Sequence, residues 1–214
     1  MKRFCKKYLR ENETSLSPEF LMKVAPPKSL TASIIAKDKE RVSSRTQVHF
    51  DKELIEKILD LRVSPNVLDN LAYLQFVSGR RISEIFDGEV KSMARKNNKV
   101  KMKLSKKTDD AFYPVQIMSD LTANDFRKEL LSARKKITGM KLDDLTSRLN
   151  KRMKSIIRKD LSTHSLRGLY ANWMWLTENP QDQNLVGYVS DILGHSAQSD
   201  SGVNYSMYTF DEED

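Results

Sequence analysis

Two histidines, one arginine and two tyrosines are the residues whose types and spacing point to chemistry. His164 and Arg167 stand three positions apart in a predicted helix, and His195 follows a Leu-Gly pair. Tyr205 and Tyr208 come after it. A guanidinium neutralises phosphate oxygens with its fork of donors, imidazoles transfer protons, and a phenolic oxygen is a competent nucleophile. Together these groups can attack a phosphodiester without a metal ion.

The composition favours a soluble protein with a polyanionic partner. The 214 residues carry 37 Lys and Arg against 29 Asp and Glu, a formal net charge of +8 at pH 7. With 39% hydrophobic and 31% charged residues, the chain can build one medium domain with an extension. Nucleic acid is the commonest partner for such a balance, although charge alone leaves a basic protein without that partner equally open.

The cysteine content and the hydropathy of the chain exclude several classes of protein. Cys5 is the only cysteine, so an internal disulfide framework and a cysteine-rich zinc site are excluded. The first residues lack the apolar stretch of a secretory signal, and no apolar run is long enough to span a bilayer. The prediction is a cytoplasmic protein, nucleoid-associated or in a host cell, with no membrane partner.

Residues 1–46 differ in composition from the remainder. They are basic, contain Pro18, Pro26 and Pro27, and continue into a passage rich in Ser, Thr and Lys. Short apolar pieces of this kind cannot form a core. We predict a flexible arm or linker there and a catalytic domain over residues 47–214. An arm that tracks a DNA backbone, or the remnant of a DNA-binding domain, is the alternative.

Helical patterning begins after Phe50. Asp51 is a good N-cap for a helix whose apolar residues recur at helical spacing as far as Leu61. Pro65 introduces a second helix, and Gly79 is a natural left-handed stop for it. A short helix starts directly after that glycine.

Residues 88–118 predict strands. Apolar and lysine side chains alternate over residues 99–104, and residues 112–117 return after a turn at residues 108–110. A small antiparallel sheet with one solvated, basic face follows from this alternation.

The chain beyond Ser119 is helical again. Helices are predicted near residues 123–136 and 141–158, and another begins at Thr163, before a polar loop over residues 181–187. The predicted fold class is therefore α+β, mainly helical, with a small antiparallel β-sheet.

These residues line up with the motifs of a known family. Gly79–Glu84 resembles the Gly-x-Arg-x-Ser-Glu box of the tyrosine recombinases (phage integrases), and Lys107 stands where the lysine turn of their small sheet is expected. His164–Arg167 is similar to the family's His-x-x-Arg box, and Leu193–His195 resembles its Leu-Gly-His box. Tyr205 falls near the position of the nucleophile. Five motifs in the family's order predict a tyrosine-recombinase-like catalytic domain.

The sequence departs from the usual family pattern in ways that indicate which branch of the family it resembles. Tyr205 follows His195 by ten positions, one more than the usual gap, which leaves Tyr208 as an alternative nucleophile. An extra polar loop over residues 179–187, with Arg-x-Leu-Tyr-Ala beginning at Arg167, looks more like the telomere resolvase (protelomerase) branch than like simple integrases. The family's N-terminal clamping domain and exchanged C-terminal element are expected to be absent or minimal.

The resemblance implies a role for each site residue. Tyr205 attacks the scissile phosphate and forms a 3′-phosphotyrosine, while Arg81 and Arg167 grip the non-bridging oxygens. Glu84 orients Arg81. Lys107 protonates the departing 5′-oxygen.

Three further residues handle protons in this scheme. A free tyrosine titrates near pH 10, so His195 or His164 accepts or relays its proton. Lys106 is the alternative proton donor to the 5′-oxygen. The phosphodiester energy stays in the tyrosyl bond, and the sequence shows no glycine-rich phosphate loop or zinc-ligand cluster. No metal, ATP or other cofactor is therefore implied.

Predicted contacts with the DNA backbone come from Arg80, Lys101, Lys103, Lys151 and Arg152. A solvated charged face is the alternative for the helical cations among them. The predicted partners are double-stranded DNA and further copies of the chain, as a dimer or a tetramer.

The predicted function is DNA breaking and rejoining by an enzyme of a phage or mobile element. A hairpin-forming telomere resolvase competes with an integrase that exchanges strands, because both use the same five motifs. A non-catalytic DNA-binding protein that keeps the fold is the alternative from another class. An RNA-binding protein of unrelated fold has no aromatic-rich sheet motif behind it.

Overall fold

The computed structural model describes residues 48–92, 98–104, 111–118, 121–178, 184–194 and 207–211. The chain divides into two units, residues 1–45 and 46–214, and every described residue lies in the second. The predicted arm over residues 1–46 lies outside the described residues, so its flexibility stays a prediction.

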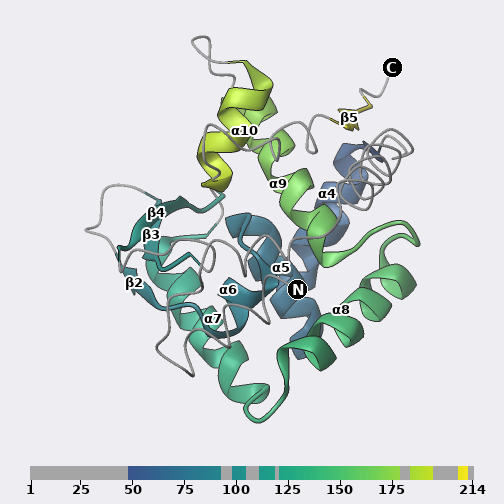
Figure 1. Cartoon of the computed structure of the whole chain (residues 1–214). Helices are drawn as coiled ribbons and strands as arrows, with labels where there is room; N and C mark the ends of the chain where they lie inside the picture. Colours follow the sequence, from purple (N-terminus) through teal and green to yellow (C-terminus); the bar gives the residue numbers. More distant parts are fainter. Residues whose placement is uncertain are drawn as a thin grey trace, which may run out of the picture. The chain divides into compact units, whose positions relative to one another are not determined.

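Helices make up most of the described chain (Figure 1). They are α4 (Lys52–Asp60), the 3-10 helix η1 (Leu61–Val63), α5 (Val67–Ser78), α6 (Ile82–Asp87), α7 (Ala123–Lys136), α8 (Leu142–Ile156), α9 (Thr163–Glu178) and α10 (Leu185–Leu193). The strands are β1 (Val48–Phe50), β2 (Val90–Ser92), β3 (Lys99–Met102), β4 (Tyr113–Gln116) and β5 (Tyr208–Phe210). The predicted class, mainly helical α+β with a small antiparallel sheet, is confirmed. In this part of the chain no helix is both long and apolar enough to cross a membrane.

Capping residues set the ends of the first two long helices. The Asp51 side chain accepts a hydrogen bond from the Leu54 backbone N–H at 2.7 Å, which confirms it as the N-cap of α4. Asn66 accepts from the Leu68 N–H at 3.0 Å and caps α5. Gly79 ends α5 with φ at 60°, the left-handed region that favours glycine, so the predicted stop is also confirmed.

Helix α5 is the element against which the other helices pack. It contacts α4, α7, α8 and α9, and it lies at the centre of the helices in Figure 1. Its buried residues lie on every side, as expected of a helix that is surrounded rather than amphipathic. Gln75 Nε2 donates to Thr163 O at 2.8 Å, which joins α5 to the first residue of α9.

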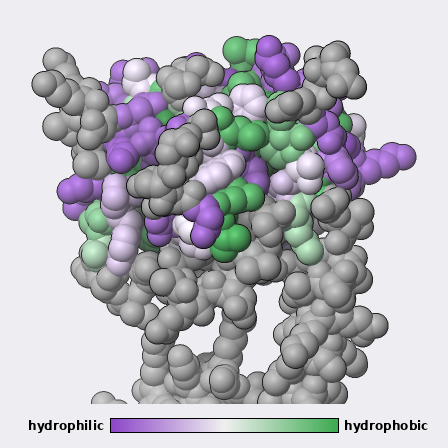
Figure 2. All heavy atoms as spheres, turned by 90° about the horizontal axis from the view of Figure 1, so that it is seen from above, coloured by the Kyte–Doolittle hydropathy of each residue, from purple (hydrophilic) through white to green (hydrophobic). Residues whose placement is uncertain are grey.

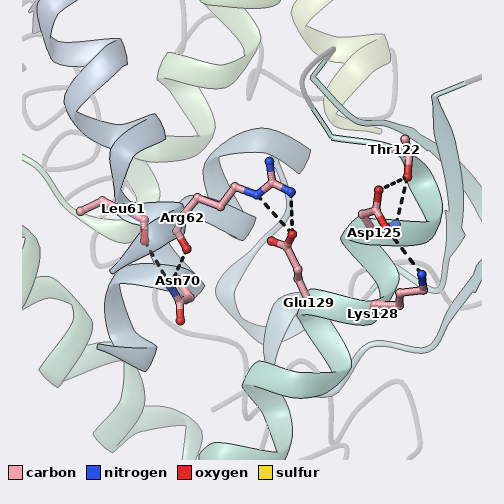
Figure 3. A network of polar contacts seen from close by, with 7 residues as sticks. All are labelled: Leu61, Arg62, Asn70, Thr122, Asp125, Lys128 and Glu129. Atoms are coloured by element: carbon pink, nitrogen blue, oxygen red, sulfur yellow. Dashed lines mark hydrogen bonds and ion pairs between the residues drawn. The ribbon is translucent and has the colours of Figure 1, made fainter. Parts of the chain in front are cut away.

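A polar network holds η1 and α7 against α5 (Figure 3). Asn70 of α5 donates to the backbone carbonyl of Arg62 at 3.0 Å. The Arg62 guanidinium in turn reaches Glu129 of α7, with Nε at 3.2 Å and Nη2 at 2.8 Å from Oε1. Thr122 caps α7 by accepting from the Asp125 N–H at 3.1 Å. These contacts join η1 to both α5 and α7.

The antiparallel sheet has the strand order β2-β3-β4. Val100 of β3 stands opposite Val115 of β4, and both are buried together with Met102. Lys101 between them is exposed. The predicted alternation of apolar and basic faces is confirmed, while the predicted turn at residues 108–110 lies outside the described residues.

A second pair of strands joins segments that are far apart in the sequence. β1 and β5 run parallel, with Val48 opposite Tyr208 and Phe50 opposite Phe210. Phe210 packs edge-on against Phe50, with 5.4 Å between ring centroids, and lies 5.9 Å from the Trp173 ring of α9. Three-residue strands carry too short a pattern to be predicted from sequence.

The start of α10 corrects one prediction. Asn184 caps this helix by accepting from the Gly187 backbone N–H at 2.8 Å, and the helix begins at Leu185. Residues 185–187, predicted as part of a polar loop, are therefore helical, because an asparagine N-cap can begin a helix inside a polar stretch.

Candidate active site

The first predicted arginine stands at the start of α6. Arg81 is the N-cap residue, and its Nη1 lies 3.0 Å from Glu84 Oε1. Glu84 also accepts the Arg81 backbone N–H at 3.1 Å, the usual contact of a glutamate in the third position of a helix. The Arg81 side chain is 20% exposed and that of Glu84 is 0% exposed. Part of the Arg81 side chain therefore faces solvent, while its Nη1 is bound to the buried Glu84 carboxylate.

Arg134 of α7 fixes the other end of α6. Its Nε donates to Ile85 O at 2.7 Å, and its Nη2 donates to the carbonyls of Glu84 and Gly88, both at 2.8 Å. Carbonyls in the last turn of a helix point outward and accept donors from elsewhere. The short helix that carries Arg81 is thus held at both ends.

Arg80 is buried and donates to backbone carbonyls. The residue is 1% exposed, and it donates from Nε to Ser78 O at 3.2 Å and from Nη2 to Ile192 O at 2.8 Å. It lies between Gly79, which ends α5 in the left-handed region, and Arg81, which begins α6. Arg80 therefore supports the end of α10, and its predicted contact with DNA stays a prediction.

Helix α9 carries the second predicted arginine. Ser162 and Ser165 fix its start, because the hydroxyl oxygen of each accepts the backbone N–H of the other at 3.2 Å. Arg167 is 1% exposed, and its Nη2 donates to Leu193 O at 2.7 Å. His164, one turn earlier, is exposed. The two residues of the His-x-x-Arg motif therefore have different surroundings.

Both buried arginines meet the C-terminal end of α10. Arg80 and Arg167 donate to the carbonyls of its last two residues, where the helix dipole favours positive charge. Gly194 then ends the helix with φ at 68°. A Cβ built on Gly194 would lie 3.0 Å from Leu104 Cδ1 and 3.9 Å from Arg80 Nη1. Leu104 stands two positions before Lys106, so the chain that leads to the predicted lysine turn meets the Leu-Gly-His motif here.

Positive charge exceeds negative charge in this arginine cluster, defined as Arg80, Arg81 and Arg167 with Glu84. Burial alone would raise the pKa of the Glu84 carboxyl, but the three guanidinium charges and the Arg81 backbone N–H bring it below its ordinary value. Glu84 is therefore ionised at neutral pH, and its carboxylate lies within reach of three guanidinium charges. The cluster is accordingly suited to a phosphate group.

Two tyrosines near the cluster have structural roles. The Tyr170 hydroxyl donates to Gln116 O at 2.8 Å, and the Tyr188 hydroxyl donates to Glu178 Oε2 at 2.5 Å. Burial raises the pKa of Tyr170, and burial together with the Glu178 carboxylate raises the pKa of Tyr188. A phenol with a raised pKa ionises less readily, so neither is suited to act as a nucleophile.

Four of the predicted site residues lie outside the described residues: Lys106, Lys107, His195 and Tyr205. Tyr208 is described, and its ring lies against Gly168 of α9, the residue after Arg167. The structure thus brings together Arg81, Glu84, Arg167 and the start of the Leu-Gly-His motif. Within the described ranges no three His, Cys, Asp or Glu side chains are grouped as metal ligands.

The other predicted DNA contacts differ in their surroundings. Lys101 and Lys151 are exposed. Lys103 forms an ion pair at 3.0 Å with the glutamate that precedes β2. Arg152 makes two hydrogen bonds of 2.9 Å to the buried Asp69, and these bonds lower the pKa of the Asp69 carboxyl. Arg152 therefore joins α8 to α5, while the two exposed lysines extend into solvent.

The sequence did not predict two residues that support the site, Arg134 and Gly168. Arg134 showed only the ordinary signal of a basic residue in the last turn of a helix. The sequence did not predict the burial of Arg80 either. Its one local signal was the position of Arg80 directly after a helix-ending glycine, where successive side chains point in different directions.

The fold and the arginine cluster define a class of protein. A helical domain with a small antiparallel sheet, in which two arginine motifs meet the Leu-Gly pair at the end of α10, has the architecture expected of a tyrosine-recombinase-like catalytic domain. Within that class, residues 44–208 match the family model of the telomere resolvase ResT/TelK catalytic domain. The match spans more than half of the chain, and the chain belongs to this family.

Solved structures share the fold at low sequence identity. A protelomerase TelA variant covalently complexed with substrate DNA has a TM-score of 0.72 at 19% identity, with 96% of this chain and 74% of that chain covered. Protelomerase TelK complexed with substrate DNA has a TM-score of 0.68 at 17% identity, covering 97% of this chain and 47% of that one. XerA recombinase follows with 0.52 at 14% identity, covering 94% and 67%. These likenesses concern the fold, and no curated protein matches the sequence.

Proposed function

We propose that this chain breaks and rejoins duplex DNA as a telomere resolvase, through a covalent bond between Tyr205 and a 3′-phosphate, and that it closes the ends as hairpins. The observation that carries the proposal is the arginine cluster, in which the charges of Arg80, Arg81 and Arg167 gather around the carboxylate of Glu84. Such a cluster binds and stabilises a phosphate whose charge grows in the transition state.

The cleavage step transfers one phosphoryl group from the 5′-oxygen of the DNA to the oxygen of Tyr205. The Tyr205 hydroxyl oxygen attacks phosphorus as the bond from phosphorus to the 5′-oxygen breaks. The phenolic proton passes to His195 or His164, and Lys107, or Lys106 in its place, gives a proton to the departing 5′-oxygen. Arg81 holds a non-bridging oxygen from its solvent-facing edge.

Arg167 is the second ligand of the phosphate in this scheme. A guanidinium carries five N–H donors, so Arg167 can hold Leu193 O at 2.7 Å and still reach a phosphate oxygen. Its bond to Leu193 sets the guanidinium beside the motif that leads to His195. The buried contact therefore pre-organises one side of the site.

The rejoining step decides between the two products. A 5′-hydroxyl attacks the phosphotyrosine, a new phosphodiester forms, and the bond between phosphorus and the tyrosine oxygen breaks. If that hydroxyl belongs to the complementary strand of the same end, the end closes as a hairpin. Membership of the ResT/TelK family favours this product over strand exchange.

Duplex DNA and a second copy of the chain are the proposed partners. The TelA and TelK structures with similar folds were solved as complexes with substrate DNA. Two breaks on opposite strands need two active sites, so two copies are required to close both ends. The exposed Lys101 and Lys151 would contact backbone phosphates and make the affinity fall steeply with salt.

Covalent capture tests the proposal. The chain is incubated, without divalent metal or nucleotide, with duplexes that carry randomised inverted repeats and a nick beside the symmetry axis. The short strand released by cleavage diffuses away from the nick, so the covalent intermediate accumulates. The expected result is a protein band that stays bound to DNA through SDS denaturation and disappears in Tyr205→Phe. Sequencing of the captured DNA then supplies an intact site. Placed off-centre in a duplex, it should give two hairpins, each running on a denaturing gel at twice the length of the arm that it closes.

Matched arginine variants test the role of the cluster. Arg81→Ala should slow adduct formation by about a hundredfold to a thousandfold, the usual effect of losing one donor to the transition state. Arg127→Ala, at an exposed position of α7, should leave the rate unchanged. Absence of an adduct with the unchanged chain on every duplex would contradict the proposal and favour a DNA-binding protein without catalysis. Recombined duplexes in place of hairpins would assign it to strand exchange.

A further inference from the structure

The β1–β5 pair fixes the chain shortly after Tyr205. Val48 N donates to Met207 O at 2.9 Å, and Asp211 N donates to Phe50 O at 2.8 Å, so backbone hydrogen bonds flank β5 on both sides. β5 also contacts α9, beside which it lies in Figure 1. A strand held in this way cannot shift along its partner without breaking its hydrogen bonds.

Tyr208 is seated on a glycine next to the second arginine of the cluster. A Cβ built on Gly168 would lie 2.3 Å from Tyr208 Cζ and 2.7 Å from its hydroxyl oxygen. The phenol ring therefore occupies the place that any side chain at position 168 would take. Gly168 follows Arg167 directly and lies one helical turn beyond the exposed His164.

We propose that Tyr208 is a positioning residue, an anchor for the segment that carries Tyr205, and not a second nucleophile. This inference rests on the proposed function, because it concerns the tyrosine that performs the cleavage. Three residues of extended chain span at most about 10 Å, so the seat on Gly168 confines Tyr205 to that distance from Tyr208.

The contact distance gives the expected size of the effect. Carbon atoms pack at about 3.5 Å or more, so an alanine at position 168 displaces the Tyr208 ring by roughly 1 Å. A misplacement of about 1 Å away from the chemistry can slow catalysis about a hundredfold. Gly168→Ala should therefore slow cleavage by about that factor while DNA binding is kept.

The test measures two quantities for each variant on the captured site. One is the single-turnover rate of adduct formation at saturating DNA, and the other is the Kd for the same duplex. Tyr208→Phe keeps the ring and should cleave at the unchanged rate. Tyr208→Ala and Gly168→Ala should lose rate without a matching rise in Kd. Gly187→Ala is the control, since it makes the same substitution in α10 where only Asn184 Oδ1, at 3.3 Å, is near.

A double variant shows whether the two positions act through their contact. Tyr208→Val removes the ring that the alanine at position 168 would meet, so Gly168→Ala combined with Tyr208→Val should be no slower than Tyr208→Val alone. Near-ultraviolet circular dichroism confirms that each variant is folded. Independent, multiplying losses would mean that the contact is not the cause.

Opposite outcomes separate this inference from the proposed function. An adduct that is lost in Tyr208→Phe and kept in Tyr205→Phe would make Tyr208 the nucleophile, which overturns the anchor but leaves DNA cleavage standing. Full cleavage by Tyr208→Ala would likewise overturn the anchor alone. If the unchanged chain forms no adduct on any duplex, the proposed function fails and the inference fails with it.

Discussion

Replacement of Glu84 by glutamine probes the charge balance of the arginine cluster. Glutamine has nearly the same size and can still accept the Arg81 backbone N–H, but it removes the negative charge on which the three arginines act. Loss of one partner from a buried ion pair costs about 3–5 kcal/mol. Because the Arg81 side chain is 20% exposed, we expect the free energy of unfolding to fall by about 3 kcal/mol, the lower end of that range.

The pH dependence of this loss has a definite sign. The folded state lowers the pKa of the Glu84 carboxyl, so its contribution is complete above the unfolded pKa of about 4.3. The contribution disappears as the pH falls through the lower, native value. The difference between the unchanged chain and Glu84→Gln should therefore be constant from about pH 5 to 7 and shrink below about pH 4.

Urea unfolding measures both effects. Trp173 and Trp175 of α9 report unfolding by fluorescence, and circular dichroism of the helices should give the same transition. The control is Glu53→Gln, an exposed partner of Lys57 on α4, which should leave the midpoint nearly unchanged. A loss below about 1 kcal/mol, or one that does not change in acid, would refute Glu84 as the counter-ion of the cluster.

Other predictions follow from single contacts. Gly79→Ala should lower the midpoint of thermal unfolding by several degrees in calorimetry, because φ at 60° strains alanine and its Cβ would lie 2.1 Å from Tyr170 Cδ1; an unchanged midpoint would contradict this packing. Arg134→Met should lower the free energy of urea unfolding by about 2–3 kcal/mol, because three carbonyls at the end of α6 lose a charged donor, and Arg134→Lys should recover only part of it. Asp69→Asn should lower the melting midpoint at neutral pH and approach the unchanged chain in acid, because the hydrogen bond from Arg152 lowers the pKa of the folded Asp69 carboxyl. A gap that widens as the pH falls would contradict that pairing.

Local signals were sufficient to predict most of the fold. Asp51 and Gly79 mark helix ends because a cap depends on the residue itself and on the next turn of backbone. The strands of the antiparallel sheet follow from a strict alternation of lysine and apolar residues. The β1–β5 pair could not be predicted, because each strand has three residues and its partner lies 160 positions away, from Val48 to Tyr208.

The sequence motifs predicted which residues form the site, but not whether each side chain is buried or paired. The motif places Arg80 and Arg81 side by side, and the helix-ending Gly79 before them is only a weak local signal of which one enters the interior. That choice depends on the carbonyl of Ile192, which lies 112 positions further along the chain. The pairing of Arg152 with the buried Asp69 is a similar case, since a cation on a helix surface and one in an ion pair have the same sequence pattern.

The parallel pairing of β1 with β5 also joins the two ends of the described chain. The two strands stand 160 positions apart, from Val48 to Tyr208, and the helices α6, α9 and α10 of the arginine cluster lie between them in the sequence. Closing so long a loop costs conformational entropy, which the contacts of the three-residue β5 with β1 and α9 must offset. The strand that holds Tyr208 is therefore expected to open at a lower free energy than the helical core, which native-state hydrogen exchange would detect.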